Sequence, residues 1–290
     1  MRLSQSHQEK VEDMHQFHAV FYELKHELSG RSVIKSFMLV TTLMIIVLGS
    51  TTELFFKGYT ETSQSVFTFA IALFWVGIFN SITVICRIRP RIKSQVVQGL
   101  SIGYYIMANA AFQLIQCLFQ AAIVTFLFGA ASHFKIIEGC PSDGVVTKFF
   151  IELFLFAFLV IFSADTLGLA ISSICRNEVS AMTTMPFVLI AEMVLSNALF
   201  KLPEIGDFSL GWLSIAMISR WGVELLGTIC HVTSYPMLIP DMLPDKWPEL
   251  LYSFDKVYFL KCIAWLLLIS IVNILASVVL LRHIKKENLL

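Results

Sequence analysis

The stretch SQVVQGLSIGYYIMANAAFQLIQCLFQAAIVTFLFGAASH, residues 94–133, runs for forty residues without an acidic side chain, a lysine or an arginine. About 20 consecutive apolar residues are enough for a helix to cross the hydrocarbon layer of a bilayer, so this stretch predicts a membrane-spanning helix. The whole chain of 290 residues agrees, because it is 57% hydrophobic and only 14% charged, against about 25% charged residues in soluble domains. We therefore expect an all-α polytopic membrane protein.

Six spanning helices are expected along the chain. The third is longer than a bilayer needs, so it must tilt or extend out of the membrane. A seven-span alternative would add Leu210–Ile229, but Arg220 and Glu224 make that segment costly to place in hydrocarbon. The six predicted spans are Phe37–Phe56, Val66–Cys86, Ile102–Ser132, Phe149–Ser173, Val179–Phe200 and Val257–Leu281.

The distribution of charge predicts how these spans are oriented. Loops that carry an excess of lysine and arginine stay on the cytoplasmic side. Basic residues precede the first span, fill the second and fourth loops and follow the last span: Lys10, Lys25, Arg31, Arg87, Arg89, Arg91, Lys93, Arg176, Arg282, Lys285 and Lys286. The alternate loops are richer in acidic residues: Glu61, Glu138, Asp143, Glu204, Asp207, Asp241, Asp245 and Glu249. We expect a multi-pass protein of the cytoplasmic (plasma) membrane with both termini in the cytoplasm.

Two segments outside the spans have patterns of their own. Residues 1–32 place apolar side chains every three to four positions among charged ones, which predicts an amphipathic helix along the cytoplasmic face of the bilayer. The six-span domain would then occupy residues 33–290. Within it, residues 201–256 are expected outside the cell, where five prolines divide the segment into turns and short helices that return toward the membrane.

The sequence contains no G-x-x-x-x-G-K-[ST], H-E-x-x-H, G-x-S-x-G or C-x-x-C pattern, so we expect no nucleotide, metal or catalytic site in this chain. A net charge of zero gives no indication of a nucleic-acid partner. Cys140 and Cys230 fall in loops expected outside the cell, where a disulfide could persist. Two unpaired thiols are the alternative.

Ionisable residues inside spans are costly, by about 2.5–3.5 kcal/mol for an unpaired charge at mid-bilayer. Glu152 and Lys261 lie near span ends, from which their side chains can reach the surface, so we assign them structural roles. Glu192 lies within the fifth span. Asp165 is deeper in the fourth, and two roles stay open for it: a hydrogen-bonded packing residue or part of a transport or coupling path. An intramembrane protease would need a second acid or a Ser–His pair at the same depth.

Several segments, in this order and spacing, resemble ABC exporters of the G subfamily. RIRPRIKSQVVQGLSIGYYIMANAAFQ (87–113) is similar to the coupling-helix segment and the start of the third span. DTLGLAISSICRN (165–177) is similar to the end of the fourth span. NEVSAMTTMPFVLIAEMVLSNALFKLPEI (177–205) and SLGWLSIAMISRWGVELL (209–226) resemble the fifth span, its hydrophobic plug and an outside re-entrant segment. VVLLRHIKKENLL (278–290) resembles the family's C-terminal end.

The resemblance implies a permease that works as a dimer, each copy resting on an ABC ATP-binding subunit or domain that holds ATP and Mg. The second and fifth spans of the two copies would enclose a cleft for a hydrophobic or amphipathic substrate on its way out. The residues implied in coupling to the ATPase are Arg87, Arg89, Arg91, Lys93 and Gln95, within and just before a coupling helix at 89–100. The implied substrate path is Phe74, Phe79, Asn80, Met182, Met185 and Phe187, and the implied plug is Leu199 and Phe200.

Two departures from the family pattern bear on the dimer. Ile88 and Gln95 stand where the family carries glutamates, and Asn197 replaces a glycine of the fifth span, at a site where small residues let helices approach closely. Both departures suit a specialised permease or one half of an unequal pair. Alternative functions are an ABC permease for lipid-linked polysaccharide and a six-span secondary carrier or membrane enzyme. The last would need more embedded polar chemistry than Asp165 alone.

Overall fold

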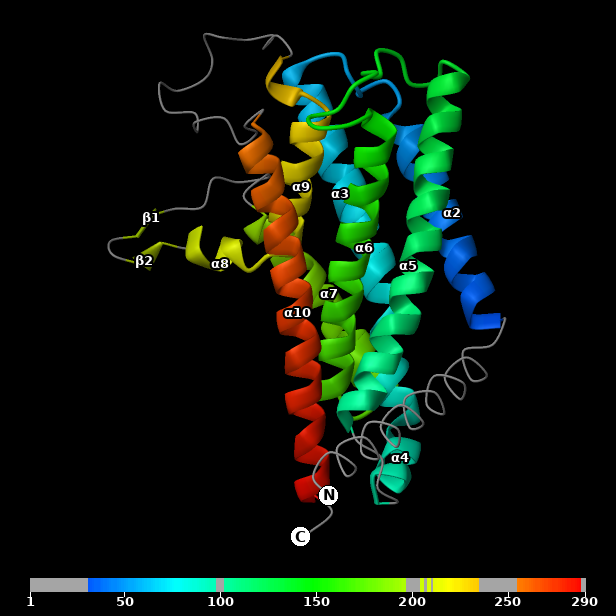
Figure 1. The fold of residues 1–290 in the computed structure, drawn as a ribbon, viewed down its shortest axis with the longest axis vertical. Coiled ribbons are helices and arrows are strands. Elements are labelled where there is room, and N and C mark those ends of the chain that lie inside the picture. The colour runs from blue at the N-terminus through cyan, green and yellow to red at the C-terminus, as the bar shows by residue number, and fades with distance from the viewer. Residues whose placement is uncertain are drawn as a thin grey trace, which may run out of the picture.

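The computed structural model describes residues 31–97, 102–196, 204–205, 208–209, 211–234 and 255–287. Its long helices form one bundle, with α4 at one end and the α5–α6 connection at the other (Figure 1). We call the first the α4 end and the second the α9 end, after helix α9 (Ile218–Ile229), which ends beside the α5–α6 connection. The helices are α2 (Arg31–Thr51), α3 (Tyr59–Ser81), α4 (Val84–Val97), α5 (Ile102–His133), α6 (Phe149–Ile174), α7 (Glu178–Leu195) and α10 (Lys256–Glu287).

The predicted class is confirmed: this is an all-helical polytopic membrane protein. Within the described residues, five helical stretches are long and apolar enough to cross a membrane, and the shorter apolar helix Ser36–Thr51 accompanies them. The second helix begins at Tyr59, seven residues before the predicted start. The predicted amphipathic helix over residues 1–32 lies outside the described residues, apart from the first two residues of α2.

The first helix ends at Thr51, five residues before the predicted end. Residues 52–57 turn instead, and Phe56 takes a left-handed backbone conformation with φ 61°. The turn directs the side chains of Phe55 and Phe56 into the bundle, where both are buried. The Phe55 ring meets those of Phe69 and Phe128 edge to face, at centroid distances of 6.2 and 5.5 Å. Aromatic packing at this depth therefore outweighs continuation of the helix.

Helix α6 is the centre of the bundle and packs against α3, α5, α9 and α10. Its approach to α3 is very close at two glycines. A Cβ added at Gly77 of α3 would collide with the backbone oxygen of Ile161, and one added at Gly168 of α6 would lie 2.9 Å from the backbone oxygen of Ile78. Small residues at such positions let two helix backbones touch in a membrane, where dispersion packing drives association.

The segment between α7 and α10 folds back onto the bundle. It contains a two-stranded antiparallel pair, β1 (Glu204–Ile205) with β2 (Phe208–Ser209), then α8 (Gly211–Ile215), α9 (Ile218–Ile229) and the 3₁₀ turn η1 (Val232–Ser234). Figure 1 shows β1, β2 and α8 to one side of the bundle and α9 beside α3 and α10. The predicted short helices are therefore present.

Helix α9 is too short to cross a bilayer, so the seven-span alternative is wrong. All of its residues but Arg220 are buried. Gly222 near its start packs against Val160 and Ala70, in the middle of α6 and α3, while His231 just after its end contacts the Asp143 carbonyl oxygen at 3.2 Å, in the α5–α6 connection. Helix α9 thus runs from the middle of the bundle to the α9 end.

Candidate functional site

Helix α4 contains the predicted coupling residues and is joined tightly to α6. The chain turns for two residues after α3, and the Ser172 hydroxyl of α6 then accepts hydrogen bonds from the backbone N–H groups of Ile85 and Cys86 at 3.0 and 3.2 Å. A side-chain oxygen in this position satisfies N–H groups that the first turn of a helix leaves unpaired. The start of α4 is therefore set by α6.

Arg89, one of the predicted coupling residues, strengthens the same junction. Its Nη1 donates a hydrogen bond to the carbonyl oxygen of Cys175, the residue that ends α6. Basic side chains commonly satisfy the last carbonyl groups of a helix in this way. Arg87 and Arg91 are exposed on α4, whereas the side chains of Lys93 and Gln95 lie outside the described part of the structure. The coupling role of these five residues stays a prediction.

The predicted path residues of α3 lie in three different environments. Phe74 is fully buried and packs within the core of this protomer. Phe79 is 38% exposed, and its ring contacts that of Trp75 at 6.4 Å. Asn80 is half-buried and hydrogen-bonded to other helices. In this conformation Phe79 is the one of the three whose side chain is open to a partner or a substrate.

The predicted path residues of α7 also differ in burial. Met185 is buried, while Met182 and Phe187 are 46% and 73% exposed. The predicted plug, Leu199 and Phe200, lies outside the described residues, as does Asn197. The structure therefore leaves the path and the plug as predictions, with exposed apolar side chains on α3 and α7.

A polar cluster links α2, α3 and α5, and we did not anticipate it from the sequence. Asn80 donates a hydrogen bond to the Gln120 side-chain oxygen at 2.8 Å, and Gln120 in turn donates to Ser36 at 2.7 Å. Gln116, one turn before Gln120, donates to Ser36 at 2.9 Å. The available signal was the pair Gln116 and Gln120, at i and i+4 in a span that also contains Asn109 and Gln113. Such bonds fix the positions of neighbouring spans, since hydrocarbon offers no other partner.

Asp165 is completely buried in the middle of α6. Neither carboxylate oxygen has a hydrogen-bond partner among the described residues. Its backbone oxygen accepts a bond from the Ser81 hydroxyl of α3. The predicted alternative of a hydrogen-bonded packing role therefore applies to the backbone of this residue but not to its carboxyl group, and the transport or coupling role stays a prediction.

Glu152 does not reach the surface, contrary to our expectation. It is 2% exposed, and its carboxylate accepts hydrogen bonds from the backbone N–H groups of Val145, Val146 and Thr147 at 2.6–2.8 Å. Gly144 makes room for this carboxylate, because a Cβ at that position would collide with it. Glu152 therefore shapes the α5–α6 connection, which is a structural role of a different kind from the one predicted.

A second polar cluster joins α9 to α10. Glu224 accepts hydrogen bonds from Arg220 at 3.0 Å and from the Tyr258 hydroxyl at 2.7 Å. The Trp221 ring stacks on Trp265 at 5.3 Å with an interplanar angle of 8°. Lys261 is exposed, as predicted, with its ammonium group 5.6 Å from the Trp221 ring. These contacts hold α9 firmly against the last span.

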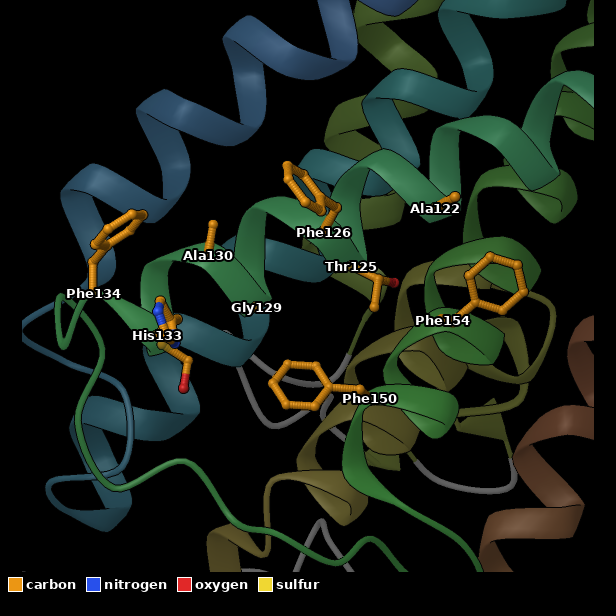
Figure 2. Close-up of a pocket in the computed structure, with 10 residues that line it drawn as sticks. Ala122, Thr125, Phe126, Gly129, Ala130, His133, Phe134, Phe150 and Phe154 are labelled. Atoms are coloured by element: carbon orange, nitrogen blue, oxygen red, sulfur yellow. The ribbon is translucent and has the colours of Figure 1, made fainter.

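An apolar groove of about 930 Å³ lies between α5 and α6 toward the α9 end. Figure 2 shows Phe150 and Phe154 of α6 on one side of it and Phe126 and His133 of α5 on the other. None of the predicted path residues lines the groove. Its remaining lining residues are Ala122, Thr125, Gly129, Ala130, Ser132 and Phe134.

Comparison with known proteins identifies the family. The family model described as "ABC-2 type transporter" matches residues 17–229, which is 213 of the 290 residues. A comparison with curated proteins found no match. The matched residues run from the segment before α2 to the end of α9, so they include α2 to α7 and the folded-back helices α8 and α9 but not α10. The chain therefore belongs to the ABC-2 type transporter family, as a membrane permease domain rather than an ATPase domain.

Proposed function

We propose that the chain is the permease of an ATP-driven exporter that moves a hydrophobic or amphipathic substrate outward. An ABC ATP-binding subunit or domain would supply the energy and would hold ATP and Mg. The observation that carries the proposal is the attachment of α4 to α6. Ser172 and Arg89 join the first half of the basic helix α4 to the last turn of α6, so that a force applied to α4 acts on the helix at the centre of the bundle.

The charge of α4 suits contact with a separate protein. Arg87 and Arg91 are exposed at the end of the bundle, where the positive-inside rule places the cytoplasm. Charged groups on the rim of an interface raise association rates and select partners more than they add affinity. An ATPase groove with acidic side chains would complement this helix.

The exposed apolar side chains of α3 and α7 support the predicted dimer. Phe79, Met182 and Phe187 would be covered by a second copy or a paralogue, and the space between the two copies would form the substrate cleft. A path lined by phenylalanine and methionine binds through apolar contact and adapts to different shapes. This favours hydrophobic and amphipathic substrates over sugars, and it rests on side chains that face away from the bundle of one protomer.

Copurification tests the proposal. The chain, expressed from its own genomic context and extracted in mild detergent, should retain an ABC ATPase that hydrolyses ATP. Reversing charge on the coupling segment with Arg91→Glu and Lys93→Glu should release that ATPase or abolish its response to the permease, while the chain still inserts into the membrane. Lys148→Glu is the matched control, because Lys148 is exposed and forms only a surface pair with Asp143 at 3.3 Å, which is worth little to stability.

Retention of full ATPase binding and hydrolysis by the doubly reversed chain would contradict a coupling role for α4. Loss of both in the Lys148→Glu control would show that any charge reversal damages the chain. A purified chain without an ATPase, from cells that hold its natural partners, would reject the exporter function itself.

A further inference from the structure

Helix α7, which carries half of the predicted substrate path, is attached to its own protomer along one narrow face. Its buried residues are Ala181, Met185, Leu189 and Glu192, three or four residues apart. Its main contacts are with α4 at one end and with α8 and α9 at the other. Helix α7 therefore touches both the coupling helix and the folded-back helix, and the Glu192 end of its buried face meets α9.

Helix α9 lacks a cap of its own at the start. Met217 occupies the N-cap position and provides no side-chain hydrogen bond. Unpaired N–H groups at a buried helix start are costly in hydrocarbon, where water cannot satisfy them. The start of α9 lies in the middle of the bundle, so another part of the chain has to satisfy these groups.

Glu192 of α7 supplies that cap from a different helix. Its carboxylate accepts hydrogen bonds from the backbone N–H groups of Ile218 and Ser219 at 3.3 and 2.9 Å, and from the Ser219 hydroxyl at 2.8 Å. The Ser219 hydroxyl also contacts the Glu192 backbone oxygen at 2.6 Å. Glu192 is 3% exposed. Hydrogen bonds to a carboxylate at a helix N-terminus are strengthened by the partial positive charge of that end.

The two sides of this contact differ in how firmly they are held. Helix α9 is fixed to α3, α6 and α10 by the stacking of Trp221 on Trp265, the hydrogen bond from Tyr258 to Glu224 and the close packing of Gly222. The opposite face of α7 is exposed. A movement of α7 relative to the bundle would therefore strain the Glu192 contact while α9 stayed with the bundle.

We propose that Glu192 is a positioning residue that latches α7 to the start of α9 in the resting permease and releases it during transport. The inference rests on the proposed function. The latch keeps α7 in its resting position through hydrogen bonds that form only when the Glu192 carboxylate meets the first turn of α9. Release lets α7, which carries Met182, Met185 and Phe187 of the predicted path, move relative to the bundle.

Two kinds of variant test the latch in the complete complex with its ATPase in lipid nanodiscs, measured by ATP hydrolysis without added substrate. Glu192→Gln places an amide NH₂ group among N–H donors and should raise substrate-free hydrolysis by about fivefold, the factor that corresponds to one weakened hydrogen bond. Ser219→Ala, which removes one donor and keeps the backbone contacts, should give a smaller rise in the same direction. Glu152→Gln is the matched control, because Glu152 is an equally buried carboxylate that accepts backbone N–H groups far from α7.

A disulfide between α7 and α9 tests the opposite effect, a latch that cannot open. The chain with Glu192→Cys and Ser219→Cys should form a disulfide under mild oxidation, because the two residues are in direct contact, with 2.6 Å between Ser219 Oγ and the Glu192 backbone oxygen. Mass spectrometry detects the linked peptide. Hydrolysis should fall about tenfold relative to the reduced form of the same chain, the effect of a barrier raised by some 1.4 kcal/mol, and should rise again on reduction. Ser219→Cys alone, oxidised in the same way, should not lose activity.

The outcomes separate the latch from the proposed function. A bound, active ATPase that responds neither to Glu192→Gln nor to the disulfide rejects the latch alone. An equal rise in hydrolysis with Glu152→Gln also rejects it, because the effect would then be general destabilisation. An unmodified chain that binds no ATPase rejects the exporter function and the latch together.

Discussion

Replacing Gly77 by alanine should loosen the contact between α3 and α6 on which the bundle is built. The added Cβ would collide with the backbone oxygen of Ile161 and lie 2.6 Å from the Cβ of Ala164. A backbone group cannot swing away as a flexible side chain can, so the two helices must separate. Overpacking costs about 1–3 kcal/mol. A collision with a backbone atom places Gly77→Ala in the upper part of that range, at about 2–3 kcal/mol, of which alanine recovers about 1 kcal/mol through its better helix propensity. We expect a net loss of about 1–2 kcal/mol.

Thermal unfolding in detergent measures this loss. The native cysteines provide the signal, because five of the six, all except Cys140, are buried and react with a thiol dye as the bundle opens. For a chain of this size about 1 kcal/mol shifts the midpoint by roughly 2–4 °C, so the Gly77→Ala midpoint should fall by about 2–8 °C. Gly49→Ala is the control, since a Cβ there meets no atom within 4 Å. A Gly77→Ala midpoint at or above that of the unmodified chain would refute the close packing of α3 and α6.

Two further predictions concern Cys140 and Asp165. Burial raises the pKa of the Cys140 thiol, so a membrane-impermeant thiol reagent on intact cells should label Cys140 slowly at neutral pH and faster as rising pH forms the thiolate. Cys230 should stay unlabelled, and Lys285→Cys should react only after the cells are opened. Labelling of Lys285→Cys in intact cells, with Cys140 unlabelled, would show that the orientation is the reverse of the predicted one. Asp165→Asn should keep or raise the thermal midpoint, because the carboxylate has no partner to lose among the described residues and an amide is cheaper to bury than a charge; a fall comparable to that of Gly77→Ala would contradict this.

Composition and apolar run length were sufficient to predict the helical bundle, but they did not predict where the first two helices begin and end. The polar residues after Gly58 predict a loop, yet α3 begins at Tyr59. The Ser65 hydroxyl there bonds the Glu61 carbonyl oxygen one turn back, so this polar stretch is compatible with a helix in an apolar setting. The apolar Phe55 and Phe56 read as helix, yet they turn into the aromatic core. At Phe55 and Phe56, contacts with other helices decide the structure, and a local pattern does not contain them.

The candidate site, too, could be predicted from the sequence only in part. The depth of Asp165 and the basic character of α4 can be predicted from span length and charge alone. The partners of Glu192 cannot, because its carboxylate is satisfied by backbone N–H groups of a segment whose position depends on the tertiary fold. For Glu192 those groups belong to Ile218 and Ser219, 26 and 27 residues later. The position of a carboxylate in a predicted span therefore does not indicate its partner: Glu192 has one in α9, whereas the Asp165 carboxylate has none among the described residues.

Helix α6 connects the two places where the proposed mechanism acts. At its C-terminal end, Ser172 and the Cys175 carbonyl oxygen position α4, and in its middle Val160 packs against Gly222 of α9. Between them, Gly168 holds α6 against α3. Because α3, α6 and α9 pack this closely, they are suited to move as one body. Helix α7 contacts that body along its one buried face, from Ala181 to Glu192, so motion of α7 relative to the body is concentrated on that face. The Glu192 contact is made of hydrogen bonds that can break and re-form, whereas the Gly77 and Gly168 contacts cannot open without separating the core of the bundle.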